Sequence, residues 1–232
     1  MNQNYDPQEL AKFATLAAHW WDKNGELKTL HQINPLRLCY IDDIVKLNGK
    51  SVIDVGCGGG ILAESMAFAG AKVTGIDMNK SVIDVAKLHQ LESGANVEYL
   101  HVATETIAEE RKEQYDVVTC LEMLEHVPDP AAIIAACAQL VKPQGHVIFS
   151  TLNRNPKSFL FAIVGAEYLL KILPKNTHDY AKFIRPSELG NWSRQAGLIP
   201  KNTKGMSYHP FSQTFSLTDD VSVNYLFHVT KG

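Results

Sequence analysis

The sequence SVIDVGCGGG, residues 51–60, joins a strand pattern to a glycine-rich turn. Its first half is dominated by β-branched apolar residues, which is typical of a strand buried on both faces of a parallel sheet. Four glycines then end the strand, and residues 61–69 (ILAESMAFA) have the composition of a helix. A strand, a glycine turn and a helix in this order allow backbone to approach a nucleotide-like ligand closely.

The glycine turn differs from a dinucleotide-binding fingerprint in two ways. Its spacing is G-x-G-x-G at Gly56, Gly58 and Gly60, and the third glycine position of G-x-G-x-x-G is occupied by Ile61. A carboxylate, Asp54, stands two residues before the first glycine. Such a charge repels a pyrophosphate and attracts an ammonium or sulfonium group. We therefore predict that Asp54, Gly56 and Gly58 bind a cationic cofactor.

A second acidic residue strengthens this interpretation. The short strand predicted over residues 72–76 is followed by Asp77, 23 residues after Asp54. An acidic residue at the end of the second strand can accept hydrogen bonds from both ribose hydroxyls. The glycine turn and the two acids together resemble the class I S-adenosylmethionine-dependent methyltransferases. The alternatives are a nicotinamide or flavin Rossmann domain and a glycine cluster without a ligand.

Composition indicates an ordinary globular protein. The chain has 232 residues, of which 45% are hydrophobic and 20% charged, so one domain spanning residues 1–232 can bury a full core. A formal net charge of −3 gives no reason to expect nucleic-acid binding. Four cysteines without metal-ligand spacing indicate a reducing, cytoplasmic location. The first ten residues lack the pattern of a signal peptide.

Helix and strand patterns alternate along the chain. Further strands are predicted over residues 97–101, 115–120 and 145–151, and an alternating strand over residues 221–230. We expect an α/β fold of the class I methyltransferase, Rossmann-like type. Its sheet should be mostly parallel and seven-stranded, with helices on both faces and an antiparallel closing strand.

Two helices are predicted before the first strand. Asp6-Pro7 and Asn34-Pro35 both have the N-cap and N1 pattern of a helix start. Residues 1–48 should therefore form a helical cap over the cofactor. Arg37 lies in the first turn of the second predicted helix, where it either contacts a carboxylate of the ligand or is a solvated charge.

The fourth predicted strand should be followed by a turn with several ionisable side chains, at the same edge of the sheet. Leu121 is placed to touch the cofactor, and Glu122, Glu125 and His126 follow at positions i, i+3 and i+4. In one helical turn these three side chains project to one side. They can hold a divalent metal, or Glu125 and His126 can be catalytic, with His126 as general base. The alternative is a polar turn with Glu125 ion-paired and His126 capping a helix.

Five segments give a closer resemblance, to the ubiquinone biosynthesis O-methyltransferase family. They are INPLRL (33–38), DVGCGGGILAESMA (54–67), VVTCLEMLEHVPDP (117–130), STLNRNPKS (150–158) and VGAEYLLKILPKNTHDY (164–180). The resemblance implies methylation of phenol or catechol hydroxyls of polyprenylated ubiquinone precursors, at both O-methylation steps, with S-adenosylmethionine as donor and S-adenosylhomocysteine as product. It implies cofactor contacts at Arg37, Gly56, Asp77 and Leu121.

The same resemblance implies a divalent cation such as Mg²⁺, held by an E-x-x-E-H turn that is Glu122, Glu125 and His126 here. It also implies other ubiquinone-biosynthesis proteins as partners. Two alternatives are a methyltransferase of another small phenol and a non-catalytic subunit of a biosynthetic complex.

An apolar stretch at residues 158–174 (SFLFAIVGAEYLLKILP) belongs to a predicted insertion over residues 154–185. It is too short to span a bilayer, which takes about 20 residues. We expect either a lid helix packed on the domain or an interfacial helix, with nearby lysines that favour anionic lipid. The second alternative predicts peripheral association with the inner face of the membrane.

Overall fold

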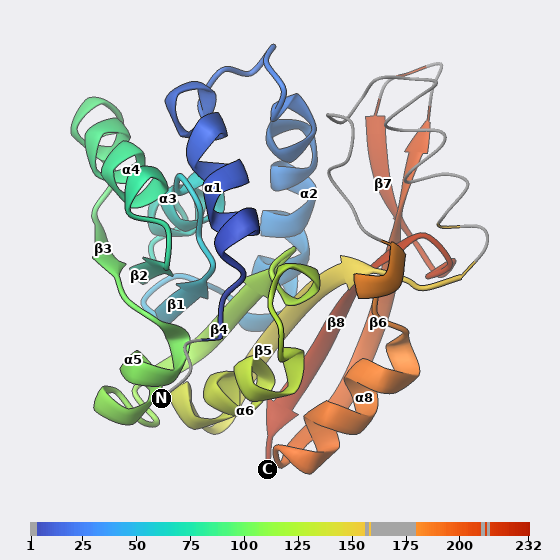
Figure 1. Cartoon of the computed structure of the whole chain (residues 1–232). Coiled ribbons are helices and arrows are strands. Elements are labelled where there is room, and N and C mark those ends of the chain that lie inside the picture. The colour runs from blue at the N-terminus through green and yellow to red at the C-terminus, as the bar shows by residue number, and fades with distance from the viewer. Residues whose placement is uncertain (1–3, 156–157, 159–179, 210–211, 213) are drawn as a thin grey trace.

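The computed structural model describes residues 4–155, 158, 180–209, 212 and 214–232. These residues form an α/β fold with one mixed sheet between two layers of helices (Figure 1). The strands are β1 (Ser51–Val55), β2 (Lys72–Asp77), β3 (Val97–His101), β4 (Tyr115–Leu121), β5 (Val141–Leu152), β6 (Leu198–His209), β7 (Thr214–Thr218) and β8 (Asn224–Lys231). Their order in the sheet is β3-β2-β1-β4-β5-β8-β6-β7.

The direction of the strands agrees with the prediction, but their number does not. Strands β1 to β5 pair in parallel, and β8 pairs antiparallel with both β5 and β6. The predicted α/β class with a mostly parallel sheet is confirmed. The predicted seven strands are wrong, because the described residues contribute eight. The additional strand, β7, extends the antiparallel edge by pairing with β6.

The described helices and 3₁₀ turns begin mostly where the sequence places start signals. They are α1 (Pro7–Leu16), η1 (Ala17–His19), α2 (Lys28–Val45), α3 (Ile61–Phe68), α4 (Lys80–Ser93), α5 (Thr104–Glu110), η2 (Leu124–His126), α6 (Pro130–Leu140), η4 (Tyr180–Lys182) and α8 (Pro186–Gln195). Asp6 and Asp129 are N-caps whose side chains accept from backbone amides, and a proline follows each. These caps satisfy amides that would otherwise lack partners.

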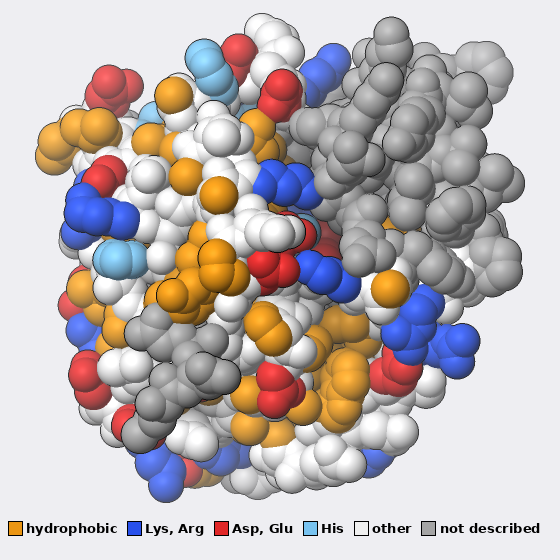
Figure 2. Space-filling view, viewed as in Figure 1, with side chains coloured by type: hydrophobic (Ala, Val, Ile, Leu, Met, Phe, Trp, Pro, Cys, Tyr) orange, Lys and Arg blue, Asp and Glu red, His pale blue; other side chains and the backbone are white. Residues whose placement is uncertain are grey.

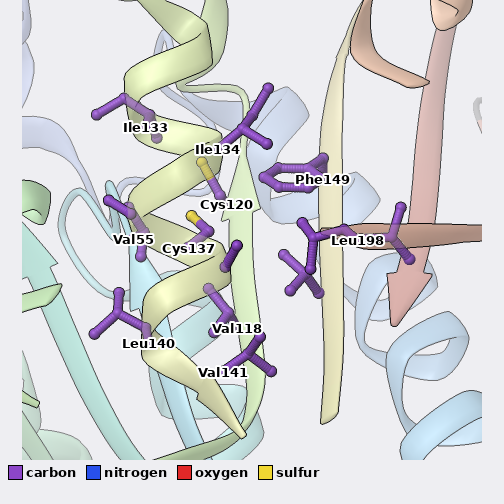
Figure 3. Close-up of a cluster of buried hydrophobic side chains, with 14 of the residues drawn as sticks. Val55, Val118, Cys120, Ile133, Ile134, Cys137, Leu140, Val141, Phe149 and Leu198 are labelled. Carbon is purple, nitrogen blue, oxygen red and sulfur yellow. The ribbon is translucent and has the colours of Figure 1, made fainter. Parts of the chain in front are cut away.

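The core has two sides because strand side chains alternate between the faces of the sheet. Val118 and Cys120 of β4 pack with α6, whereas Val117 and Leu121 belong to the cluster on the opposite face. Figure 3 shows Ile133, Ile134, Cys137 and Leu140 of α6 over the central strands, with Phe149 of β5 beside them. The two buried layers pack against both faces of β1, β2 and β4, and the carboxyl ends of these parallel strands meet at one edge.

The predicted start of the second helix is wrong. The second helix does not begin at Asn34-Pro35 but at Lys28, so that Pro35 lies inside α2 and Arg37 lies near its middle. An internal proline removes one helical hydrogen bond at a cost of about 3 kcal/mol. The helix nevertheless continues to Val45, because Tyr40 and Ile41 beyond the proline are buried in the core.

The predicted insertion over residues 154–185 is described only at its two ends and at Ser158, so the lid or interfacial helix expected over residues 158–174 lies outside the described residues. In the ranges that are described, no helix combines the length and the apolar character needed to cross a bilayer.

Candidate active site

A cavity of about 480 Å³ lies at the carboxyl ends of β1, β2 and β4, beneath α1, η1 and α2. Ligands of open α/β sheets bind at this edge. The lining includes all six predicted cofactor-binding residues and two of the three residues predicted after β4. These eight are Arg37, Asp54, Gly56, Gly58, Asp77, Leu121, Glu122 and His126. Segments distant in the sequence thus form one site.

The glycine turn needs its glycines for backbone conformation and for packing. Gly56 and Gly58 have φ angles of +70° and +53°, which L side chains rarely adopt. A Cβ on Gly56 would lie 2.8 Å from the sulfur of Met123, and one on Gly58 would lie 2.3 Å from the ring of Trp20. A side chain at either position would therefore clash first with the protein's own side chains, Met123 or Trp20.

Asp77 fixes the glycine turn to the second strand. Its carboxylate accepts hydrogen bonds from the backbone amides of Gly58 at 3.0 Å and Asn79 at 2.8 Å. Burial raises the pKa of Asp77, although these two amides oppose the shift. Each carboxylate oxygen retains acceptor capacity, so both can still receive hydroxyl donors from a ligand in the cavity.

Asp54 is the most deeply buried acid of the cavity, with 3% of its surface exposed. The hydroxyl of Thr119 on β4 donates to Asp54 Oδ1 at 2.6 Å. Burial raises the pKa of Asp54 to about 7, whereas the hydrogen bond from Thr119 and the charge of Arg37 oppose the shift. A cation in the cavity would favour the ionised carboxylate and lower this pKa.

This linkage gives a pH prediction for cofactor binding. With a pKa of about 7, the carboxyl group of Asp54 becomes mostly protonated in the free protein as the pH falls to 6, so a cationic ligand must then displace its proton. The dissociation constant of S-adenosylmethionine should therefore fall as pH rises from 6 to 8, by up to about tenfold per pH unit below the pKa. Calorimetry of wild type and Asp54→Asn, which gives the dissociation constant at each pH, separates the effect of Asp54 from protonation of the ligand's own groups. If the dissociation constants of the two proteins depend equally on pH, Asp54 is not the cause of the dependence.

Arg37 projects from α2 into the cavity and is nearly fully buried. Its Nη2 donates to Glu122 Oε1 at 2.6 Å, and the hydroxyl of Ser150 donates to the same oxygen at 2.6 Å. The Nε of Arg37 is buried and has no hydrogen-bond partner among the described residues. A buried donor without a partner is costly. The guanidinium is therefore suited to bind a carboxylate or another acceptor of a ligand.

The two residues predicted to be catalytic lie in different environments. Glu125 is buried behind the cavity, where Oε2 accepts from the hydroxyl of Thr151 at 2.9 Å. Burial, and then the charge of Glu122, raise the pKa of Glu125 to about 7. His126 instead lines the cavity, and its Nδ1 lies 2.9 Å from Glu9 Oε2. This placement favours His126 over Glu125 for direct contact with a substrate.

The three side chains after β4 do not converge on one point. Glu122 has a positive φ of 55°, and only residues 124–126 form a 3₁₀ turn, so the i, i+3, i+4 geometry of an α-helix is absent. Across the part of the chain that the structure describes, no group of three His, Cys, Asp or Glu side chains is placed to hold a metal ion. These residues do not fit a divalent cation in this arrangement.

Several residues of the site were not predicted. Trp20, after η1, places its ring against Gly58 and Gly59, and the indole of Trp21 donates to the carbonyl of Gly59 at 2.9 Å. Glu9 and Phe13 of α1 contact the imidazole of His126. The aromatic pair at positions 20–21 was visible in the sequence as part of an apolar face, but no spacing connects it to the glycine turn.

Comparisons with known proteins show the family of the chain. A family model described as a methyltransferase domain matches residues 29–199. The ubiquinone biosynthesis O-methyltransferases of Pseudomonas fluorescens strain Pf0-1 and Pseudomonas savastanoi are each 60% identical to this chain over 228 residues, 98% of both chains. The chain belongs to the ubiquinone biosynthesis O-methyltransferase family. The family resemblance found in the sequence is thereby confirmed.

Solved structures support the fold of this ubiquinone biosynthesis O-methyltransferase family member. The magnesium protoporphyrin IX methyltransferase of Synechocystis PCC 6803 with bound S-adenosylhomocysteine aligns with a TM-score of 0.66 at 18% identity, over 91% of this chain and 88% of that one. Its S-adenosylmethionine complex aligns with a TM-score of 0.65 at 18% identity, over 100% of both chains. At this identity the likeness concerns the fold.

Proposed function

We propose that this chain transfers a methyl group from S-adenosylmethionine to phenol or catechol hydroxyls of polyprenylated ubiquinone precursors, at both O-methylation steps. One observation carries the proposal: a single cavity is lined by the glycine turn and the two acids at one end and by His126 after β4. Family membership at 60% identity supports the substrate class.

The cavity provides complementary groups for each part of the cofactor. Asp77 would accept the ribose hydroxyls, and the carboxylate of Asp54 would stabilise the ligand's positive charge. Arg37 would bind the carboxylate of the methionine moiety, using the donor that lacks a partner in the described residues. Leu121 would supply apolar contact. The cofactor would thus be held along the ends of β1, β2 and β4.

The remaining cavity suits an aromatic acceptor. Apolar side chains from distant parts of the chain line the cavity, including Leu10, Phe13, Leu30, Leu152 and Phe215. A ring held there would have its hydroxyl near the sulfonium methyl group. Such orientation in a site with little water supplies a large part of the rate enhancement.

The reaction would be an in-line displacement. A phenol has a pKa of about 10, so little phenolate is present at neutral pH and a base must remove the proton. The imidazole of His126 would accept it as the phenol oxygen attacks the methyl carbon. The C–O bond forms, the C–S bond breaks, and its electron pair remains on the sulfur of S-adenosylhomocysteine.

A direct assay tests the proposed function. The purified protein is incubated with methyl-labelled S-adenosylmethionine and a short-chain prenylated catechol, and the products are identified by mass spectrometry. We expect a mono-O-methylated catechol and stoichiometric S-adenosylhomocysteine. Transfer only to unprenylated phenols would indicate a different small-molecule substrate. Cofactor binding without transfer would indicate a non-catalytic subunit, and binding of a nicotinamide cofactor would indicate an oxidoreductase.

We further propose that the enzyme is cytoplasmic and associates peripherally with the membrane, because its prenylated substrate partitions into lipid. The support is the apolar sequence 158–174 and its flanking lysines. Binding to liposomes should rise with anionic lipid content and weaken with salt. Joint substitution of Phe159→Asp and Ile163→Asp should abolish flotation with liposomes.

The matched control for this flotation experiment is the joint substitution of Leu88→Asp and Leu91→Asp, which changes two apolar residues of α4 that are 64% and 79% exposed. This variant should float as the wild type does. Absence of flotation by the wild type would contradict the membrane proposal, as would equal flotation of all three proteins.

A further inference from the structure

Glu9 of α1 contacts His126 directly, although 117 residues separate them in the sequence. The Nδ1 of the imidazole lies 2.9 Å from Oε2 of the carboxylate, and both side chains are mostly buried. Both residues also line the cavity. The family model begins at residue 29, so Glu9 lies outside the part of the chain that it matches.

The surroundings keep Glu9 ionised. The hydrogen bond with His126 is the main cause that lowers the pKa of Glu9 to about 2. Lys182 Nζ lies 3.4 Å from Oε1 of the same carboxylate and 3.2 Å from Oδ2 of Asp6. Figure 2 shows acidic and basic side chains gathered at the centre of this face, where α1 approaches η4. Glu9 is therefore a fixed negative charge beside the imidazole.

A carboxylate accepts hydrogen bonds and cannot donate them. The contact therefore requires the proton of a neutral His126 to be on Nδ1, which leaves a lone pair on Nε2. In the described part of the chain Nε2 has no hydrogen-bond partner. Phe13 packs edge-on against the imidazole, with ring centroids 5.1 Å apart and an interplanar angle of 88°. Glu9 and Phe13 thus fix the imidazole ring, and Nε2 is available to accept a proton.

We propose that Glu9 is a positioning residue for the methyl transfer, fixing the tautomer and the orientation of His126 so that Nε2 accepts the proton of the phenol. This inference rests on the proposed function. As the C–O bond forms and the C–S bond breaks, the proton moves to Nε2. Glu9 stabilises the resulting imidazolium, which then returns the proton to water.

Glu9 is not the only attachment of α1 to the rest of the molecule. The side chain of Asn79 donates to the carbonyl of Leu10 at 2.8 Å, and Lys182 pairs with Asp6. Loss of the Glu9 carboxylate alone should therefore leave α1 in place. A lower turnover of Glu9→Gln would then result from the changed environment of His126 and not from displacement of α1.

The experiment combines kinetics with spectroscopy on the full chain. Glu9→Gln should lower kcat by about tenfold to a hundredfold, as for other partners that orient a functional histidine, and leave the KM for the prenylated catechol and the affinity for S-adenosylmethionine within about twofold. Glu113→Gln, which removes an ion-paired carboxylate outside the cavity, is the matched control and should retain full turnover.

Two further readouts distinguish positioning from a merely structural role. Long-range ¹H–¹⁵N imidazole spectra should show His126 as the Nδ1–H tautomer in the wild type and as a mixture in Glu9→Gln. In a double-mutant cycle, Glu9→Gln should cause no further loss in the His126→Ala background.

Unchanged turnover and an unchanged tautomer in Glu9→Gln would overturn the inference, as would a full additional loss in the double variant. If the wild type methylates no catechol at all, the proposed function fails. The tautomer spectrum would still decide whether Glu9 sets the protonation of His126.

Discussion

Replacing His126 with alanine should lower turnover about 10²–10⁴-fold and leave the affinity for S-adenosylmethionine nearly unchanged. The reason is geometric, since the imidazole contacts Glu9 and Phe13 of α1, whereas Asp77, which would hold the cofactor, contacts the glycine turn. The variant would therefore bind the donor normally and fail to remove the proton from the acceptor.

Single-turnover kinetics with a prenylated catechol measure this prediction, and calorimetry measures cofactor affinity. His209→Ala is a suitable control, because this exposed imidazole contacts the hydroxyl of Ser216 on the β6–β7 hairpin. Wild-type turnover in His126→Ala would show that another group accepts the proton. Loss of cofactor affinity would instead place His126 in the cofactor site.

The second large effect is expected for Gly60→Ala. Gly60 precedes α3 with a φ angle of +91°, and a Cβ there would lie 2.1 Å from the hydroxyl oxygen of Tyr99. Tyr99 is 4% exposed and its ring packs against Gly75, so it cannot move aside. Backbone strain of about 1–2 kcal/mol and overpacking of about 1–3 kcal/mol should together destabilise the fold by about 2–5 kcal/mol.

Gly94→Ala is the matched control, because Gly94 has a similar φ of +75° and nothing within 4 Å of the added Cβ. The free energy of unfolding of Gly94→Ala should fall only by the contribution of backbone strain. Urea denaturation of the ligand-free proteins gives both free energies of unfolding, and their difference isolates the clash with Tyr99. Equal losses in the two variants would mean that Tyr99 is displaced without cost.

The parallel half of the fold was predictable because each of its strands is a short β-branched run between helical patterns. The sequence pattern of such a buried strand can be recognised without knowing which distant residues it contacts. The hairpin of β6 and β7 was not predicted, since its polar residues around Pro200 and Asn202 interrupt any alternation, and the pairing shifts register there. Helix α5 was missed because seven residues with few apolar positions give no clear period.

The cofactor half of the site was predictable for the same reason as the strands. Asp54 and Asp77 occupy the ends of predicted strands, and parallel strands bring such ends together. The prediction of one face for Glu122, Glu125 and His126 depended on an α-helical turn, which the positive φ of Glu122 prevents. Glu9 could not be found from the sequence, because its contact with His126 depends on how α1 crosses the sheet edge.

The position of β8 in the sheet limits the order in which the strands can pair during synthesis of the chain. Although β8 follows β5, β6 and β7 along the chain, it lies between β5 and β6 and pairs with both. A nascent chain leaving the ribosome can form the sheet from β3 to β5 early, but the β6–β7 hairpin has no place to attach until β8 has been synthesised. Asn224 of β8 also lines the cavity. The complete site therefore forms only after β8 has been synthesised, and a chain that lacks β8 exposes the unpaired edge of β5 to aggregation.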